Sequence, residues 1–322
     1  MKRQDLERKK DSTGAADNGH WQKTPKPSWI RVRLPSGEAF QRLKDLMRSK
    51  SLHTVCEEAR CPNMAECWGC GTATFLILGD ICTRDCRFCA VKTGNPGLNF
   101  LNLKEEPGQV ADAVAAMELR HAVITSVTRD DLEDGGASIF AETIRKIHER
   151  TPGCTVEVLI PDFKGNLDSL KAVVKARPDI LGHNVETVPR LYPLARPQAA
   201  YGRSLRVLGV VKEIDLNILT KSGVMVGLGE TREEILDVMK DLRSVGCDIF
   251  TIGQYLSPTQ HHLPVVRYYT PEEFESLKEA GIRAGFRWVE SGPLVRSSYH
   301  AEAQVRELRT RQVGITHGPV QS

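Results

Sequence analysis

The sequence lacks any long apolar run, has little net charge and contains few cysteines outside one short stretch. No apolar run approaches the roughly 18 residues that a membrane-spanning helix needs, so a helical membrane protein is not expected. The formal net charge of +3 over 322 residues is too small to indicate nucleic-acid binding. The chain is long enough for one large domain or two small ones.

The N-terminal stretch 1–28 has no apolar core for a signal peptide, and its acidic side chains are atypical of a transit peptide. Its mixed charges, glycine and proline predict a flexible N-terminal arm. Seven of the nine cysteines lie between Cys56 and Cys89. This clustering indicates metal ligation in a reducing cytoplasm rather than a disulfide framework.

The second of two cysteine triplets, Cys82, Cys86 and Cys89, has the spacing C-x3-C-x2-C. Three thiolates on one short loop bind three irons of a [4Fe–4S] cluster and leave the fourth iron open. An open iron is able to chelate S-adenosylmethionine and pass an electron to its sulfonium, which releases a radical that abstracts hydrogen from an unactivated C–H bond. A structural zinc site usually takes four ligands in paired units, which this loop lacks.

The first triplet, Cys56, Cys61 and Cys67, has the spacing C-x4-C-x5-C and is open to two interpretations. With Cys70 it makes a four-thiolate zinc or iron–sulfur site. Without Cys70 it needs a distant ligand that is not a cysteine, such as a serine alkoxide, which binds iron more weakly. The spacing alone does not separate the two.

From Thr72 onward, short β-branched apolar runs alternate with segments of helical spacing. The alternation predicts an α/β fold, a partial (β/α)6 TIM-like barrel over 72–285, between an N-terminal extension (29–71) and a C-terminal extension (286–322). A doubly wound open sheet is the alternative, weakened because no G-x-G-x-x-G follows the first strand. The predicted strands are 72–78, 121–127, 155–161, 179–184, 223–228 and 248–255. The Cys82–Cys89 loop then falls at the C-terminal ends of the strands, where such barrels carry their chemistry.

Other residues at the predicted strand ends are less decisive. Asn184 and Glu186 are placed to hydrogen-bond the ribose or amino group of a bound cofactor, or to form a structural turn. The acidic loop 128–138 either covers a bound ligand or is a solvated turn. The pair His261–His262 is interpreted as surface, and the isolated Cys154 and Cys247 as small buried hydrophobes.

Together these motifs resemble the lipoyl synthases, a family of radical S-adenosylmethionine enzymes, from about residue 28 to 302. The segments that carry the resemblance are the first cysteine triplet, WGCGTATFLILGDICTRDCRFCAV (68–91), TSVTRDDLEDGGA (125–137), HNVETV (183–188), TKSGVMVGLGET (220–231), IGQYLSPT (252–259) and RSSYH (296–300). The double triplet with the terminal Arg-Ser-Ser-Tyr is the most specific part. The alternatives are another sulfur-inserting radical enzyme, similar to biotin synthase, and a regulatory metal-binding module.

The resemblance implies two [4Fe–4S] clusters. The cluster on Cys82, Cys86 and Cys89 cleaves S-adenosylmethionine, and the auxiliary cluster on the first triplet is consumed as the sulfur source. A serine of the Arg-Ser-Ser-Tyr motif is its fourth ligand; by position this is Ser298, with Ser297 as the second choice. Cys70 departs from the family pattern and is expected to be a bystander.

The implied substrate is an octanoyl chain on a lysine of a lipoyl carrier protein, which receives sulfur at C6 and C8. Two adenosylmethionines are consumed per lipoyl group. The implied partners are the lipoyl domains of 2-oxoacid dehydrogenase E2 subunits, the glycine cleavage H protein, and a flavodoxin- or ferredoxin-type electron donor. Nucleic acid and membrane partners are not expected. The expected S-adenosylmethionine contacts are Phe88, Thr125, Ser126, Asn184, Glu186 and Lys221.

Overall fold

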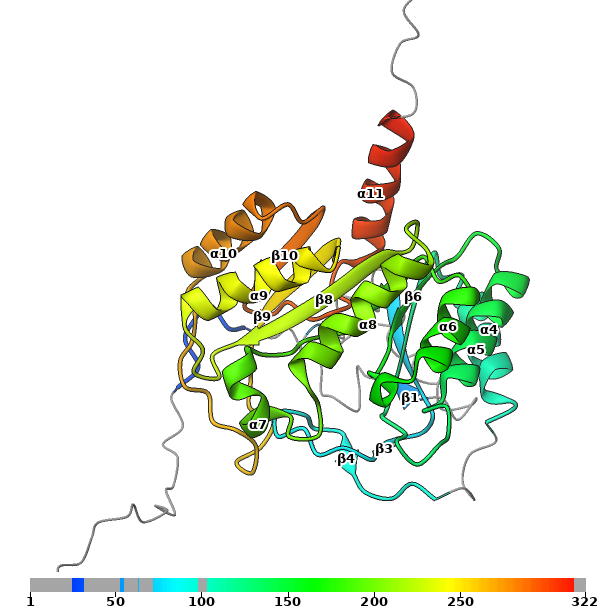
Figure 1. Cartoon of the computed structure of the whole chain (residues 1–322), viewed down its shortest axis with the longest axis horizontal. Helices are drawn as coiled ribbons and strands as arrows, with labels where there is room; N and C mark the ends of the chain where they lie inside the picture. The colour runs from blue at the N-terminus through cyan, green and yellow to red at the C-terminus, as the bar shows by residue number, and fades with distance from the viewer. Residues whose placement is uncertain (1–24, 32–52, 55–62, 64–71, 98–102, 316–322) are drawn as a thin grey trace, which may run out of the picture.

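The computed structural model describes residues 25–31, 53–54, 63, 72–97 and 103–315 (Figure 1). The first cysteine triplet, Cys70 and nearly all of the predicted N-terminal arm lie outside these described residues. The descriptions below concern the described part of the chain.

One sheet of eight strands organises the molecule, in the order β1-β2-β5-β6-β7-β8-β9-β10. All neighbours in it are parallel except β1, which pairs antiparallel with β2. The strands β3 and β4 form a separate two-stranded pair. The bounds are β1 His53–Thr54, β2 Thr72–Ile77, β3 Ile81–Cys82, β4 Lys92–Thr93, β5 His121–Ser126, β6 Thr155–Leu159, β7 Ile180–Gly182, β8 Leu219–Val226, β9 Ile249–Gln254 and β10 Trp288–Gly292.

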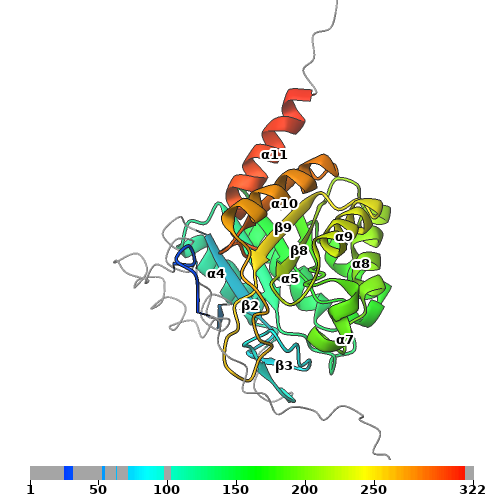
Figure 2. The same cartoon turned by 90° about the vertical axis from the view of Figure 1, so that its left-hand side faces the viewer.

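Helices connect successive parallel strands and cover the outer face of the curved sheet (Figures 1 and 2). The α-helices are α4 Glu106–Ala116, α5 Ala137–Arg150, α6 Leu167–Lys175, α7 Tyr192–Ala195, α8 Tyr201–Ile214, α9 Arg232–Ser244, α10 Pro271–Arg283 and α11 Ala301–Ile315. Strands buried on both faces explain the continuous β-branched runs in the sequence. No helix in the described ranges is long and apolar enough to span a membrane.

All six predicted strands are present, and the predicted partial barrel is confirmed. A seventh parallel strand, β10, joins β9 from within the range that we had assigned to the C-terminal extension. The strand predicted at 223–228 begins earlier, since β8 runs over Leu219–Val226. Capping boxes at Thr231 and Thr270 begin α9 and α10.

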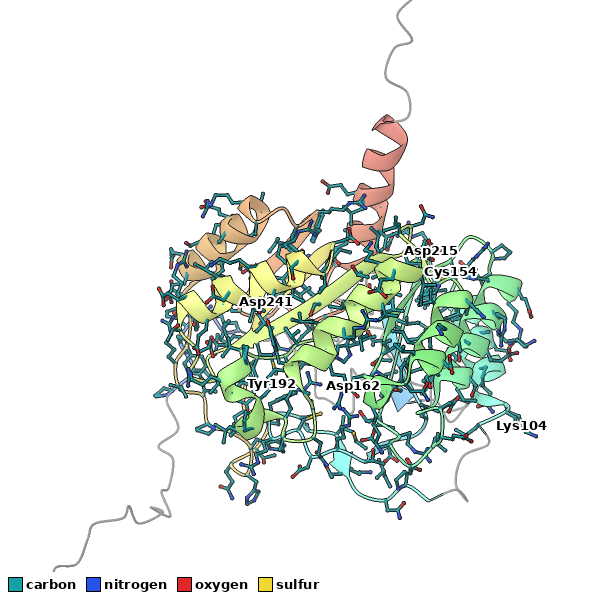
Figure 3. The ribbon with its side chains drawn as sticks, viewed as in Figure 1. Lys104, Cys154, Asp162, Tyr192, Asp215 and Asp241 are labelled. Atoms are coloured by element: carbon teal, nitrogen blue, oxygen red, sulfur yellow. The ribbon has the colours of Figure 1, made fainter. Side chains whose placement is uncertain are left out.

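The two ends of the barrel are different. Asp162 and Tyr192, which follow β6 and β7, lie at the end that carries β3 and β4, whereas Cys154 and Asp215 lie at the other end (Figure 3). At that second end α11 packs Val305 and Leu308 against residues near the starts of the parallel strands. The cysteine loop therefore lies at the C-terminal ends of the strands, the end called the mouth below.

Candidate functional site

The cysteine loop leaves β2 through a sharp turn at the barrel mouth. Leu78 and Gly79 both have positive φ, 68° and 89°, and the turn leads into β3, where Cys82 lies. Both carboxylate oxygens of Glu106 accept a hydrogen bond from the Leu78 N–H, at 3.1 and 3.0 Å. The fully buried Arg129 donates to the Leu78 carbonyl at 3.3 Å. These bonds hold a left-handed conformation that leucine rarely adopts.

Buried ion pairs fix the first half of the loop. The Arg84 guanidinium lies 2.7 Å from Asp130 and 2.6 Å from Asp162, which also pairs with Arg203 at 2.6 Å. Burial alone would raise the pKa of Asp162, but its hydrogen bond with Arg84 and the charge of Arg84 hold that pKa below its ordinary value. The acidic loop 128–138 therefore anchors the cysteine loop through Asp130.

The three thiols of the loop interact with one another. Cys82 Sγ accepts backbone hydrogen bonds from Arg84 at 3.5 Å and Thr128 at 3.4 Å. Burial raises the pKa of Cys86 to about 12, with smaller upward contributions from Cys89 and Cys82, and burial raises that of Cys89 to about 11. A metal that binds these sulfurs must therefore displace their protons.

This donor set fits a cluster better than a single ion. Within the described ranges, no three His, Cys, Asp or Glu side chains converge closely enough to hold one metal ion. In an iron–sulfur cubane each thiolate binds a different iron, so its sulfurs need not converge on one point. Three neighbouring thiols on one loop, with backbone donors to Cys82 Sγ, suit that arrangement.

A cavity of about 200 Å³ lies within the barrel mouth. Four predicted site residues line it: Thr125, Asn184, Glu186 and Ser298. The cavity lies close to the cysteine loop, because the Arg87 N–H donates to the Ala195 carbonyl at 2.9 Å and Arg196 Nη1 donates to the carbonyl of the cavity residue Asn184 at 2.9 Å. Its apolar wall comes from Val123, Leu159, Val224, Met225 and Val295.

Asn184 and Glu186 form a strained polar corner of this cavity. Glu186 has φ 65°, and its N–H donates to the Gly223 carbonyl at 2.9 Å. The Asn184 amide donates to Glu186 Oε1 at 3.2 Å. A Cβ at Gly223 would lie 2.4 Å from Thr251 Oγ1 and 3.1 Å from Asn184 Oδ1, so glycine keeps this corner open. Burial raises the pKa of Glu186, although the charge of Arg196 opposes the shift.

Arg196 is a candidate site residue that the sequence did not reveal. Its guanidinium is buried, and Nη1 donates to the carbonyls of Asn184 at 2.9 Å and Val185 at 3.4 Å. Its charge lowers the pKa values of Cys86 and Glu186. Its Nε has no hydrogen-bond partner among the described residues, which leaves a buried donor for an anionic group of a ligand.

Two polar residues near the cavity, His183 and Lys221, are already bound to other groups of the protein. His183 Nδ1 bonds the Ile160 carbonyl at 2.9 Å and Nε2 bonds Ser204 at 3.0 Å, while burial lowers the His183 pKa to about 4. Lys221 is buried, and its Nζ lies 2.9 Å from Glu157.

Lys221 does not line the cavity. Side chains two residues apart on a strand share a face, so Lys221 lies one layer below the cavity residue Gly223 on β8. The predicted cofactor contact at Lys221 is not supported by this position.

The other predicted contacts, Phe88 and Ser126, are also not among the cavity-lining residues. Phe88 packs against the apolar cluster that includes Val185 and Leu263. The hydroxyl of Ser126, at the end of β5, is buried without a partner. Ser126 thus keeps a free hydroxyl at the mouth.

The Arg-Ser-Ser-Tyr segment returns into the barrel after β10. Ser297 Oγ accepts from the Asn184 amide at 2.7 Å, and the hydroxyls of Ser298 and Thr74 are hydrogen-bonded at 3.0 Å. Four residues before Ser298, the carbonyl of Leu294 accepts from the Asn63 amide at 2.6 Å. Asn63 lies between the second and third cysteines of the first triplet in the sequence, so the two segments meet here.

Comparisons with known proteins identify the family of this chain. A family model described as the radical SAM superfamily matches residues 76–242, and one described as the N-terminal domain of lipoyl synthase matches residues 2–61. Lipoyl synthase of Rubrobacter xylanophilus is 62% identical over 90% of this chain and 89% of its own length. Lipoyl synthase of Bacillus subtilis is 57% identical over 89% of this chain and 96% of its own length.

Solved structures show the same fold. Streptococcus suis SuiB, in a crystal structure bound to S-adenosylmethionine, superposes with a TM-score of 0.54 at 11% identity. The match covers 72% of this chain and 54% of SuiB, so the chain spans about half the length of that relative. From the family matches and the extent of identity, the chain belongs to the lipoyl synthase family of the radical S-adenosylmethionine superfamily.

Proposed function

We propose that this chain catalyses lipoyl synthesis, the insertion of two sulfur atoms at C6 and C8 of a protein-bound octanoyl chain. The observation that supports this best is the contact of Asn63, which lies between Cys61 and Cys67 in the sequence, with the Leu294 carbonyl close to Ser297 and Ser298. The cysteine loop reaches the same cavity through the Arg87–Ala195 and Arg196–Asn184 hydrogen bonds. A biotin-synthase-like reaction does not explain this link.

The cofactors are S-adenosylmethionine and [4Fe–4S] clusters, which supply, when bound, a carbon-centred radical and sulfur for transfer. Cys82, Cys86 and Cys89 hold the first cluster, and the first triplet with Ser298 holds the auxiliary one. The rigid mounting of the cysteine loop on Arg84 and Arg129 keeps the cluster ligands in place while electrons arrive.

The cavity residues orient the adenosylmethionine. The Asn184 amide and the Glu186 carboxylate offer a donor and an acceptor for its polar groups, and Thr125 lies on the same wall. Arg196 is not among the cavity-lining residues but bonds the Asn184 carbonyl, and its Nε is the proposed donor for the cofactor carboxylate. The apolar wall around Met225 is suited to accept a hydrocarbon chain.

Octanoylated lipoyl carrier proteins are the proposed substrates, specifically the E2 lipoyl domains and the glycine cleavage H protein. A flavodoxin- or ferredoxin-type protein is the proposed electron donor, and the reducing cytoplasm the proposed location.

Anaerobic incubation of the reconstituted chain with S-adenosylmethionine, a strong reductant and an octanoyl-lysyl carrier peptide tests the function. Mass spectrometry of the peptide should show two added sulfurs. Formation of 5′-deoxyadenosine with an unchanged peptide would contradict the substrate but retain the radical chemistry. Neither product at full iron loading would contradict the enzymatic function.

The auxiliary ligand set has its own test. Ser298→Ala should lose the sulfur insertion but keep 5′-deoxyadenosine formation, because the auxiliary cluster then has three thiolates and an open fourth iron. Cys70→Ser is the matched control and should keep the sulfur insertion. The reverse pattern would make Cys70, rather than Ser298, the fourth ligand.

A further inference from the structure

A loop on the far side of the barrel holds the second half of the cysteine loop. This strap, residues 255–266, follows β9, which lies five places from β2 in the sheet order. Tyr255 N–H donates to the Val226 carbonyl and Val266 N–H donates to the Gly227 carbonyl, both at 2.8 Å. Tyr255 Oη also donates to the Leu263 carbonyl at 2.8 Å. The strap is thus fixed at both ends to the end of β8.

Two hydrogen bonds join the strap to the cysteine loop. Leu263 N–H donates to the carbonyl of Arg87 at 3.0 Å. His262 Nε2 lies 2.9 Å from the carbonyl oxygen of Cys89. Both acceptors lie in the short run from Arg87 to Cys89, which the ion pairs of Arg84 do not reach.

The hydrogen bonds around His262 define which of its ring nitrogens carries the proton. A carbonyl oxygen only accepts, so Nε2 must carry the proton that it donates to Cys89. Nδ1 of the neutral ring is then an acceptor, and it lies 2.8 Å from Thr259 Oγ1. The Thr259 hydroxyl in turn accepts from the His261 N–H at 3.2 Å, which leaves its own hydrogen for Nδ1. Every polar group in this series of hydrogen bonds, from the His261 N–H to the Cys89 carbonyl, has a partner.

We propose that His262 is a positioning residue for the cluster on Cys82, Cys86 and Cys89. The Nε2–H of His262 holds the Cys89 backbone in place. The strap, which is anchored at the ends of β8 and β9, fixes the position of His262. The adjacent His261 is exposed, and its ring forms no hydrogen bond or ion pair with the described residues, so only His262 of the pair contacts the cysteine loop. The inference rests on the proposed function for the identity of the cluster.

Four full-length variants test this role. Gln places an amide N–H at the reach of His Nε2, so His262→Gln should keep the bond to Cys89. His262→Asn carries the same amide but is too short, and His262→Ala has no donor. His261→Ala is the matched control. The first readout is the anaerobic rate of iron loss to a ferrous chelator, and the second is the EPR spectrum of the reduced protein with and without S-adenosylmethionine.

Loss of an outer hydrogen bond to a metal-ligand residue typically costs about 10- to 100-fold in metal affinity or activity. We expect His262→Asn and His262→Ala to lose iron about tenfold faster, to show an altered EPR response to S-adenosylmethionine, and to form 5′-deoxyadenosine about tenfold more slowly. His262→Gln and His261→Ala should resemble the unsubstituted chain.

Equal behaviour of the Gln and Asn variants would overturn the inference, since the bond to Cys89 would then not be responsible. If His262→Ala fails to fold, the comparison of His262→Gln with His262→Asn still tests the role of the bond to Cys89. If the unsubstituted, iron-loaded chain forms no 5′-deoxyadenosine, the proposed function fails, whereas the chelator rates still decide the role of His262.

Discussion

The floor of the barrel and the cavity at its mouth both hold charged side chains, but among the described residues Glu186 and Arg196 beside the cavity form no ion pair. At the floor, Glu157 lies 2.9 Å from Lys221 Nζ and 3.4 Å from His121 Nε2. At the mouth, Glu186 is strained and its pKa is raised by burial, while Arg196 Nε has no partner. Paired charges stabilise a closed floor, whereas unsatisfied groups at the mouth are available to a ligand.

The largest expected effect is the loss of stability on removal of the buried ion pair between Lys221 and Glu157 at the floor. Lys221→Met leaves the Glu157 carboxylate buried without its partner, which typically costs about 3–5 kcal/mol of unfolding free energy. Chemical unfolding measures this loss. The double variant Glu157→Gln/Lys221→Met, which removes both charges, should recover most of it. Lys240→Met, at an exposed ion pair with Asp237, is the matched control and should change stability by no more than about 0.5 kcal/mol.

The same variant decides the predicted cofactor role of Lys221. If Lys221 belongs to the floor alone, the folded fraction of Lys221→Met keeps the KM for S-adenosylmethionine of the unsubstituted chain. An increase in that KM by tenfold or more, with stability unchanged, would return Lys221 to the cofactor site.

The second effect is on binding at the mouth. Arg196→Leu removes the free Nε and should raise the KM for S-adenosylmethionine by about 10- to 100-fold, since a hydrogen bond to a charged group contributes about 1.5–3 kcal/mol. The rate of 5′-deoxyadenosine formation against cofactor concentration measures it. Arg196→Lys keeps the charge and should lose less. A KM unchanged in Arg196→Leu would place the cofactor carboxylate elsewhere.

Lys221 and Arg196 show which features of the molecule the sequence determines and which it does not. The β-branched runs locate six strands, and the cysteine spacing identifies the metal-binding loop. The strand β8 begins four residues before the predicted strand and places Lys221 beside Glu157 in the floor, so the cofactor contact at Lys221 stays a prediction. The strand β10 was missed because Glu290, Ser291 and Gly292 interrupt its apolar pattern.

Contacts between distant loops are the part that the sequence cannot supply. His262 reaches Cys89 across 173 residues, and its neighbour His261 has the same side chain without the contact. Arg196 is buried beside Cys86 only because α7 ends there, and nothing in its local sequence marks it. The outcome for the first triplet stays a prediction, since Cys56, Cys61 and Cys67 lie outside the described residues.

The third expected effect is a gain in stability in Glu186→Gln, opposite in sign to the loss expected in Lys221→Met. Because burial raises the pKa of Glu186, the folded protein binds this proton more tightly than the unfolded chain. The associated stability is present below the unfolded pKa of about 4.3 and is lost as pH rises through the folded value. Glu186→Gln removes this dependence and should stabilise the chain by about 1 kcal/mol at pH 8, with little change near pH 4.

Unfolding midpoints of Glu186→Gln and the unsubstituted chain at the two pH values measure this difference. The variant should also bind S-adenosylmethionine more weakly, which would link the instability of the mouth to its function. A variant less stable than the unsubstituted chain at pH 8 would show that Arg196 compensates the buried carboxylate fully.

The smallest effect separates the cysteines of the core from those of the loop. Cys154 and Cys247 are buried, as the sequence predicts, and burial raises their pKa values to about 11 and about 12. A buried thiol of this kind packs as a small hydrophobe and is chemically inert. Cys247→Ala should therefore cost no more than about 1 kcal/mol and leave the iron content unchanged. Cys86→Ala should lose iron and all 5′-deoxyadenosine formation with little change in stability. If Cys247→Ala lost as much iron as Cys86→Ala, a core cysteine would support a cluster. Cys247 would then not be the inert core residue that its burial predicts.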